Sequence, residues 1–431
     1  MTPRDVLAHY EFDERMVTGE FFPDEPLDVD EEDHVGVVLM NMGGPDSLET
    51  IKPFLYNLFM DPAIIDLQIP LINVPLPGLL RHWLCSAISY FRSDAKKEEY
   101  EAIGGGSPIN PLTQEQSELL ESELNEFIGD ENGPRFSTYV AMRYWKPFSE
   151  EAAEQMIEDD VDKVVLLPLY PQYSKTTTGS SLYYWKLLED QEEIPEWPTT
   201  FVQEYAANPN YLQAVSDRID EGLERFDESI RDDVPLLFSA HGTPVYEMSD
   251  RGDPYCCLIH SSVDQLMKMR GHDRPFHVAF QSKVGPAEWF SPSTPDKLEE
   301  LAEEGVRNVL VIPIAFVTDH VETSFELDIE IREEAEEAGI EQYEVTDGLN
   351  GHPSFIRALS DNVFSQLNLP ENVHDSITAN GDLICDRPVS GLPRHDEDER
   401  DLRCKFCEHV TEARCWREMD KGTKQHFPSD H

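Results

Sequence analysis

The chain has 431 residues, of which 39% are hydrophobic, a length that suits two domains with their own cores together with additional segments. Its 86 Asp and Glu residues outnumber 34 Lys and Arg residues and give a formal net charge of -52. Because a phosphate backbone attracts basic surfaces, this charge excludes nucleic acid as the main partner.

The excess of negative charge also predicts a halophilic protein from a salt-rich cytoplasm. At an ionic strength of about 1 M the Debye length falls to roughly 3 Å, which screens the self-repulsion of such a chain. The alternative is an acidic disordered protein, which the periodic apolar segments below disfavour. The chain shows no secretory signal pattern and no apolar run of about 18 residues, so we expect a cytoplasmic protein with reduced or metal-bound cysteines.

The chain begins with an acidic stretch and continues with alternating strand and helix patterns. Residues 1–34 are rich in Asp and Glu and predict a solvated tail. Runs rich in Val, Leu and Ile that are typical of buried strands lie at 35–45, 137–144, 163–173, 234–244 and 308–320. Acidic amphipathic patterns that favour helices lie at 113–127, 149–158, 210–226, 294–305 and 352–367.

This alternation predicts an α/β fold in which parallel sheets are covered by helices on both faces. The segment DQEEIPEWP interrupts the pattern and marks the boundary between two domains. The predicted organisation is an acidic tail at 1–34, a first domain at 35–190, a second at 191–350, a C-terminal helix at 351–370 and a cysteine-bearing acidic extension at 371–431.

Four of the predicted strands end in clusters of polar or special residues. These clusters are NMGGP, PQYSKTTTGSS, SAHGTP and FVTDHVE. In open α/β sheets, ligand sites form beyond the carboxyl ends of the strands. We therefore expect the chemistry where these clusters converge, in a cleft between the two α/β halves.

The sharpest signal is the spacing of three carboxylates after the strand at 308–320. Glu322, Glu326 and Glu330 are each four residues apart, so on a helix they form one line. Like charges at this spacing repel, and a purely structural helix gains nothing from them. A solvated acidic face is the alternative in so acidic a chain. Because the line begins at the end of a buried strand, its position favours cation delivery or proton removal.

A second signal is the histidine of SAHGTP, at the tip of a buried strand. The ordinary pKa of His241 lies near neutrality, which suits a general base or a metal ligand. A structural histidine is the alternative interpretation. No Gly-x-Ser-x-Gly motif indicates a hydrolase, and GGGSP at 104–108 matches neither a dinucleotide fingerprint nor a P-loop.

Two further segments carry less specific patterns. The hydroxyl-rich loop at 173–181 precedes a helical pattern, where it would cap the helix or bind an anion. The amphipathic stretch at 75–91 contains Trp83, Tyr90 and Phe91 but is too short to span a bilayer. It would line an apolar ligand entrance, lie on a bilayer, or form an ordinary core helix.

Eight motifs resemble those of the ferrochelatases in the same order along the chain, from about Val35 to Leu367. They are NMGGP, YEAIGGGSPINPLT, AMRY, LYPQYSKTTTGSS, LFSAHGTP with RGDPY, QSKVGPAEW, IPIAFVTDHVETSFELDIE and LNGHP. The resemblance implies two Rossmann-like, chelatase-like domains with a porphyrin cleft between them. It also implies an enzyme that inserts Fe²⁺ into protoporphyrin IX, with release of two protons, at the last step of haem biosynthesis.

The resemblance further implies roles for particular residues. His241 would be the catalytic histidine and Glu322 its carboxylate partner, with both groups available to the substrate iron. A path for protons or metal would continue through Asp319, His320, Glu326 and Glu330. The porphyrin would be bound by Met42 on the opposite face of the ring, by Arg92 and Ser107 at the propionates, and by Arg143, Tyr144, Tyr170 and Trp289. The stretch at 75–91 would form a hydrophobic lip for porphyrin entry and for peripheral association with a membrane.

The cysteines depart from the family pattern. Some ferrochelatases hold a [2Fe–2S] cluster on three C-terminal cysteines and a fourth in the hydroxyl-rich loop, where this chain has Lys175. The extension instead offers Cys385, Cys404, Cys407 and Cys415. Four thiolates in a short segment suit a [2Fe–2S] cluster or zinc, and free thiols are the alternative. The remaining cysteines, Cys85, Cys256 and Cys257, are expected to be structural.

The choice of porphyrin and metal is predicted from the resemblance and from Met42. Met42 favours protoporphyrin, because family members that use coproporphyrin tend to have tyrosine at that position. The alternatives are coproporphyrin as the ring, cobalt or nickel as the metal, and a non-catalytic carrier of porphyrin or haem. The route of the iron and the oligomeric state stay open.

Overall fold

The computed structural model describes residues 13–370 apart from 24, 65–67, 70–73, 76–77, 129–132 and 284–286. Within this range the chain forms two compact units. The first comprises 13–169, Lys175–Gln203 and 359–370, and the second comprises Tyr170–Ser174 and Glu204–Ala358. The extension at 371–431, with all four cysteines proposed as ligands, lies outside the described residues.

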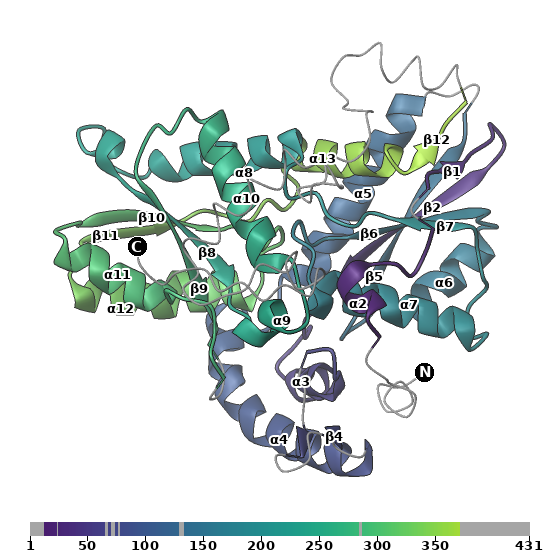
Figure 1. The fold of residues 1–431 in the computed structure, drawn as a ribbon, viewed down its shortest axis with the longest axis horizontal. Helices are drawn as coiled ribbons and strands as arrows, with labels where there is room; N and C mark the ends of the chain where they lie inside the picture. Colours follow the sequence, from purple (N-terminus) through teal and green to yellow (C-terminus); the bar gives the residue numbers. More distant parts are fainter. Residues whose placement is uncertain are drawn as a thin grey trace. The chain divides into compact units, whose positions relative to one another are not determined.

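The first unit is built on a parallel sheet in the order β5-β2-β6-β7 (Figure 1). Its strands are β2 at His34–Asn41, β5 at Arg135–Met142, β6 at Lys163–Pro168 and β7 at Thr199–Phe201. The first three confirm predicted strands, and every residue of the central strand β2 is buried. The strand β7 was not predicted, because three residues are too few to show a period.

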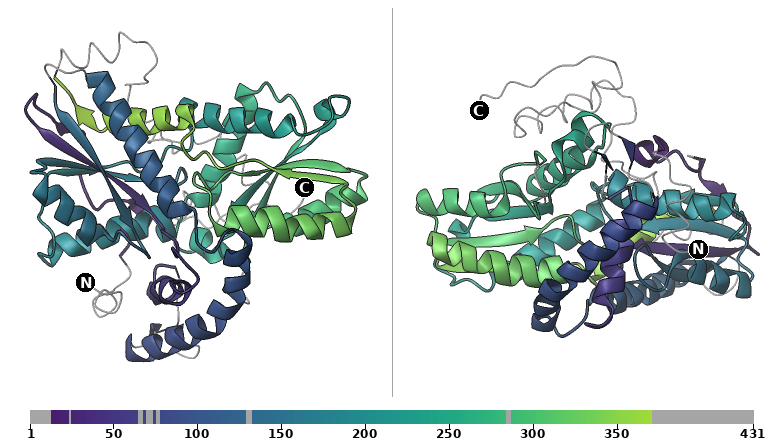
Figure 2. Two further views of the ribbon diagram at one scale, coloured as in Figure 1. Left: turned by 180° about the vertical axis from the view of Figure 1, so that it is seen from behind. Right: turned by 90° about the horizontal axis from the view of Figure 1, so that it is seen from below.

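Helices cover both faces of this sheet (Figure 2). They are α5 at Ile109–Ile128, α6 at Ser149–Glu158 and α7 at Ser180–Asp190, which continues the π-helical turn η1 at Lys175–Gly179. Met156 of α6 and Trp185 of α7 belong to the core cluster that contains Val38 and Leu166. On the other face, Ser117 of α5 donates to the hydroxyl of Thr138 at 2.9 Å.

A helical pair and two small strand pairs complete the first unit. The pair consists of α3 at Ile51–Met60 and α4 at Gly78–Ala102, which lie together at the foot of Figure 1. The short strand β1 at Leu27–Asp28 runs parallel to β12 at Leu367–Asn368. The strands β3 at Gln68–Ile69 and β4 at Val74–Pro75 form an antiparallel pair.

The second unit contains a parallel sheet in the order β11-β10-β8-β9. Its strands are β8 at Leu236–His241, β9 at Phe276–Gln281, β10 at Asn308–Pro313 and β11 at Gln342–Val345. Its helical segments are α8 at Pro209–Leu223, η2 at Arg231–Asp233, α9 at Val245–Ser249, α10 at Tyr255–Met269, α11 at Thr294–Glu303, η3 at Glu322–Glu330 and α12 at Ile331–Ala338. The helix α13 at Pro353–Phe364 begins in this unit and ends in the first.

Local sequence explains where these helices begin and which face they bury. Asn208 caps α8 by accepting from the main-chain N–H groups of Asn210 and Tyr211 at 2.9 and 3.1 Å, as an N-cap asparagine should. Leu298 of α11 and Ile331 of α12 belong to one core cluster with residues of β8 and β10. Both units therefore confirm the predicted α/β class, with parallel sheets and flanking helices.

The two sheets share one topology. In chain order, the strands of each sheet are arranged second, first, third, fourth. The chain therefore reverses direction across the sheet between the first and third strands, and loops that leave these two strands meet at the carboxyl edge. In the second unit these strands are β8 and β10, so the structure brings together the residues that follow them.

The segment at 13–34 differs from the predicted solvated tail. Met16, in the short helix α2 at Arg15–Thr18, and Phe21 are buried in the core of the first unit. Val29, next to β1, is also buried. The composition of this segment is acidic, but its few apolar side chains pack against the core of the first unit. Composition averaged over the whole segment could not show this.

Candidate active site

His241 and Glu322 are in direct contact in the second unit. His241 is the last residue of β8, and Glu322 is the first residue of η3, which follows β10. The distance between His241 Nδ1 and Glu322 Oε2 is 2.9 Å. Because a carboxylate only accepts, the ring proton lies on Nδ1 when the ring is neutral, and Nε2 then carries a lone pair. Of the two side chains, 38% and 21% remain exposed, so small reactants can reach them.

The surroundings of His241 act on its pKa in opposite directions. Burial lowers the pKa, while the charge and hydrogen bond of Glu322, assisted by the charge of Glu326, raise it. The net direction is upward from the ordinary value of 6.5. Glu322 therefore makes the ring a stronger base than an imidazole without this partner would be, which suits a general base.

The three spaced carboxylates lie on η3, a π-helix rather than the α-helix assumed from their spacing. Glu322 and Glu326 are partly buried and Glu330 is exposed, so the line leads from His241 towards solvent. Ser282, just after β9, donates to Glu326 Oε1 at 2.6 Å. Ser282 has a φ of 64°, which is uncommon for a residue other than glycine. π-Helical segments occur frequently at functional sites.

The loop after His241 depends on close backbone approach. A Cβ at Gly242 would lie 2.8 Å from the main-chain oxygen of Gln281 and 3.2 Å from Trp289 Cε3. Gly242 N–H donates to that oxygen at 2.8 Å, and Pro244 bridges to Trp289. Trp289 is thus packed beside the SAHGTP loop. Its indole nitrogen is buried and has no hydrogen-bond partner within the described residues.

Asp319 and His320, placed by the resemblance on the proton or metal path, mainly hold their own loop. Asp319 accepts hydrogen bonds from Thr323, Gly348 and Asn350. His320 is buried, and its Nδ1 lies 3.1 Å from the main-chain oxygen of Thr318. Burial lowers the pKa of His320, which keeps the ring neutral.

A buried polar network in the first unit contains Arg143 and Tyr144. Asp61 Oδ2 accepts from Arg143 Nη2 at 2.7 Å, from the Tyr144 hydroxyl at 2.8 Å and from Ser180 Oγ at 2.9 Å. The Arg143 guanidinium also lies over the ring of Tyr184, 4.3 Å from its centroid. Sequence reasoning missed Asp61 and Ser180, because their partners are distant along the chain and no local spacing marks them.

Met42 and Ser107 lie in two loops that pack against each other. Met42 is partly buried at the end of β2, and Tyr144 N–H donates to its main-chain oxygen at 3.0 Å. A Cβ at Gly44 would lie 2.5 Å from Ser107 Cβ, so only glycine allows this approach. Asn110 donates to Gly44 O at 2.8 Å and accepts from Gly44 N at 3.0 Å, and thereby joins the loops. The role of Asn110 was not predicted from the sequence.

The remaining predicted residues lie outside these clusters. Arg92, on α4, is exposed and lies over the ring of Phe59, 5.8 Å from its centroid. Tyr170 is partly buried in the second unit. Lys175 is buried and donates to the main-chain oxygen of Ala63 at 3.1 Å. Within the described residues, no group of three or more His, Cys, Asp or Glu side chains is arranged to hold a metal ion.

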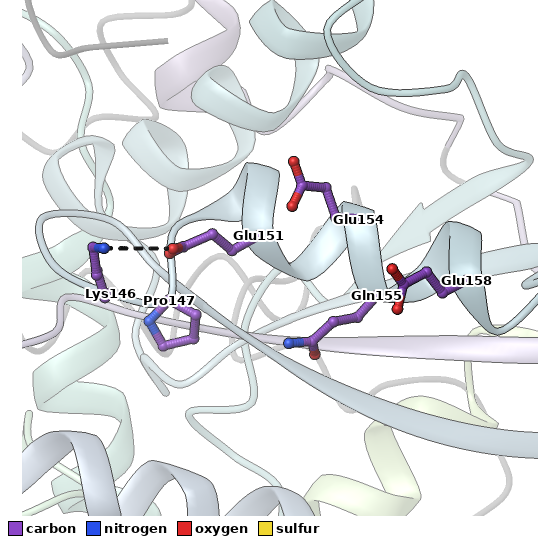
Figure 3. Close-up of a pocket in the computed structure, with 6 residues that line it drawn as sticks. All are labelled: Lys146, Pro147, Glu151, Glu154, Gln155 and Glu158. Atoms are coloured by element: carbon purple, nitrogen blue, oxygen red, sulfur yellow. Dashed lines mark ion pairs between the residues drawn. The ribbon is translucent and has the colours of Figure 1, made fainter.

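A surface hollow of about 460 Å³ lies against α6, and none of the predicted site residues lines it (Figure 3). Its lining is Lys146, Pro147, Glu151, Glu154, Gln155 and Glu158. Lys146 and Glu151 form an ion pair at 3.8 Å. The other carboxylates are spread along α6 and do not converge on one point. This hollow therefore provides no alternative active site.

Comparison with known families decides the assignment. The family model described as Ferrochelatase matches residues 34–367. The chain belongs to the ferrochelatase family. The resemblance predicted from the eight ordered motifs is thereby confirmed.

Individual ferrochelatases match over most of their length. The ferrochelatase of Synechococcus elongatus is 43% identical over 345 residues, which cover 80% of this chain and 85% of that protein. The ferrochelatase of Trichodesmium erythraeum is 42% identical over 337 residues, which cover 78% and 83%. Among solved structures, SirB from Bacillus subtilis with Fe³⁺ aligns with a TM-score of 0.43 at 10% identity, over 78% of this chain and 96% of SirB.

Proposed function

We propose that His241 and Glu322 perform the proton removal that a ferrochelatase needs in order to insert ferrous iron into a porphyrin. The observation that carries this proposal is the 2.9 Å contact between His241 Nδ1 and Glu322 Oε2 at the carboxyl edge of the second sheet. The contact fixes the tautomer of the ring and leaves Nε2 as the acceptor.

The reaction requires two pyrrole N–H protons to leave as the metal enters. His241 Nε2 accepts the first proton, and Glu322 stabilises the imidazolium that forms. Loss of that proton to solvent along Glu326 and Glu330 restores the neutral ring, which then accepts the second proton. The same carboxylates attract Fe²⁺, which is a substrate here rather than a resident cofactor. Ring distortion through binding energy at the porphyrin edge would expose the nitrogen lone pairs.

Porphyrin contacts are proposed for the residues that the resemblance implies. Met42, Arg143, Tyr144, Tyr170 and Trp289 are proposed to contact the ring, and Arg92 and Ser107 its propionates. Arg143 is already paired with Asp61. We therefore propose that Arg143 shapes the pocket through the Asp61 network rather than binding a carboxylate. Met42 supports protoporphyrin as the ring.

Anaerobic assays with purified protein test this function. Fe²⁺ is supplied with protoporphyrin or with coproporphyrin at molar KCl, and metallation is followed by absorbance. We expect turnover with Fe²⁺ and a higher kcat/KM for protoporphyrin. Preference for Co²⁺ or Ni²⁺, or for coproporphyrin, would reassign the substrates. Tight porphyrin binding without turnover would favour the carrier alternative.

We also propose that the hydrophobic lip at 75–91 docks on a bilayer surface from the cytoplasmic side. In the described part of the lip, α4 buries small or polar residues such as Cys85 and Ser89 and exposes large apolar ones. The exposed side chains are Leu79, Leu80, Trp83, Leu84, Tyr90 and Phe91. Lys52 lies over the ring of Tyr90, 5.0 Å from its centroid, and a basic side chain next to exposed aromatic ones is expected for a helix at a lipid interface. None of the helices in the described residues is long and apolar enough to cross a membrane.

A metal cluster on the extension is a separate proposal that rests on sequence. The position in the hydroxyl-rich loop is occupied by Lys175, which has no thiol. This side chain is buried and donates to the main-chain oxygen of Ala63. All four ligands would therefore come from Cys385, Cys404, Cys407 and Cys415. Visible absorbance of anaerobically purified protein, with iron, zinc and sulfide analysis, distinguishes a [2Fe–2S] cluster from zinc and from free thiols.

A further inference from the structure

The loop between β10 and η3 is held by the turn that precedes α13. Asn350, in the motif LNGHP of this turn, donates through Nδ2 to Asp319 Oδ2 at 2.7 Å. It also accepts from Asp319 N–H at 3.0 Å through Oδ1. Its own N–H donates to Val317 O at 2.8 Å. One asparagine therefore binds both the side chain and the main chain of the loop.

Gly348 also binds the carboxylate of Asp319. Its N–H lies 3.1 and 3.2 Å from the two carboxylate oxygens of Asp319. A Cβ at Gly348 would lie 2.8 Å from Asp319 Oδ1, so the turn can approach only where glycine stands. The Thr323 hydroxyl donates to the same oxygen at 3.0 Å. Both oxygens of Asp319 are therefore engaged by donors from its own unit.

These contacts bracket Glu322 in the sequence. Asp319 precedes it by three residues and Thr323 follows it directly, and the two are joined by the hydroxyl–carboxylate bond. Thr323 is buried and also accepts from His320 N–H at 3.1 Å. The first turn of η3 can therefore move only if this set of bonds breaks, and Glu322 moves with it.

We propose that Asp319 is a positioning residue. Held by Asn350 and Gly348, it sets the start of η3 so that Glu322 meets His241. It does not relay protons or metal along the acidic line. The proposal rests on the proposed function of the His241–Glu322 pair, and it gives a role to the LNGHP motif.

Asn350→Gly is the discriminating variant, because it leaves the Asp319 carboxylate in place. Asn350 has a φ of 44°, which glycine adopts without strain, so the turn keeps its shape while the side-chain bonds are lost. We expect kcat to fall about ten- to hundredfold, as for other small misplacements of reacting groups, with the KM for porphyrin changed less than about twofold. A relay role for Asp319 predicts instead that kcat of this variant equals that of the parent chain.

A double-mutant cycle with Asp319→Asn sharpens the test. If Asn350 and Asp319 act through the same set of hydrogen bonds, the kcat of the double variant falls no further than that of the worse single variant. If they act independently, the two losses in kcat multiply. Asp347→Ala is the matched control, because Asp347 lies in the same turn but pairs with Arg225 and not with the loop. It should keep both kinetic constants within about twofold. Multiplying losses, or parent-like kcat in Asn350→Gly, would overturn the proposal.

Amide hydrogen exchange separates this inference from the proposed function. In the full-length protein, Asn350→Gly should speed exchange in residues 315–324, and Asp347→Ala should not. Unchanged exchange in Asn350→Gly would overturn the proposal that Asn350 and Asp319 fix the start of η3, even if the enzyme is active. If the parent chain fails to metallate any porphyrin, the proposed function fails. The exchange result still decides whether Asn350 holds the loop that contains Asp319.

Discussion

At the scale of single residues, the site depends on one histidine whose basicity is set by its neighbours. The position of His241 at the end of a strand was predictable, because an apolar run followed by SAHGTP marks a strand tip. Its pairing with Glu322 was implied only by resemblance to the ferrochelatases. The residues are 81 positions apart, and no local spacing joins them. The same limit explains why Asp61 and Asn350 escaped notice.

The charge of Glu322 sets the pH range in which His241 can accept a proton. Only the neutral ring accepts, so kcat/KM should rise with pH through the pKa of His241 and then level off. Burial lowers that pKa, and Glu322 raises it to a net value above the ordinary one. Glu322→Gln should therefore move the acidic limb to lower pH, together with a fall in the plateau.

The matched control for this shift is Asp328→Asn. Asp328 lies on the same π-helix but pairs with Arg332, at 2.5 Å, and is not among the groups that act on His241. The acidic limb should stay in place in this variant. An acidic limb that stays in place, or moves to higher pH, in Glu322→Gln would contradict the role assigned to Glu322.

At the scale of elements, strands were predicted better than the contacts between loops. The apolar runs at 163–173 and 308–320 locate β6 and β10 because parallel strands buried on both faces need continuous apolar sequence. The π-helical form of η3 could not be predicted from the sequence, because glutamates four residues apart share a face in an α-helix as well. The packing of the NMGGP loop against the GGGSP turn depends on backbone approach, which composition alone does not reveal.

That loop contact gives a prediction for stability. Gly44→Ala would place a Cβ 2.5 Å from Ser107 Cβ, and the two loops must separate to admit it. We expect the free energy of unfolding of the first unit to fall by about 1–3 kcal/mol, as for other overpacked sites. Urea unfolding followed by fluorescence measures the change. Gly78→Ala is the control, because no atom of the described part of the chain lies within 4 Å of its added Cβ, and an equal loss in both variants would contradict the account.

The exposed face of α4 gives a prediction for membrane binding. Trp83 and Phe91 are 67% and 76% exposed, and burying each in a lipid interface is worth about 1.5–3 kcal/mol. Trp83→Glu should therefore lower the fraction of protein that floats with phospholipid vesicles by at least tenfold. Ile157→Glu, at an exposed apolar residue of α6, should leave flotation unchanged. Equal flotation of both variants would refute docking through the lip.

At the scale of the whole molecule, charge dominates the behaviour expected in solution. The net charge of -52 produces self-repulsion that only salt can screen, since the chain holds few basic residues. We predict that the midpoint of thermal unfolding rises by at least 10 °C between about 0.1 M and 2 M KCl. Differential scanning fluorimetry measures this rise. An equal midpoint at both concentrations would remove the basis for salt adaptation.

The central claim is that the His241–Glu322 pair removes protons from a bound porphyrin. The most direct measurement compares porphyrin binding and Fe²⁺ insertion in His241→Ala and the parent chain, under anaerobic conditions at molar KCl. We predict that the variant binds porphyrin with a Kd within about threefold of the parent and that its metallation rate falls by at least a hundredfold, the range lost with a general base. Metallation by His241→Ala at a rate near that of the parent would contradict the claim.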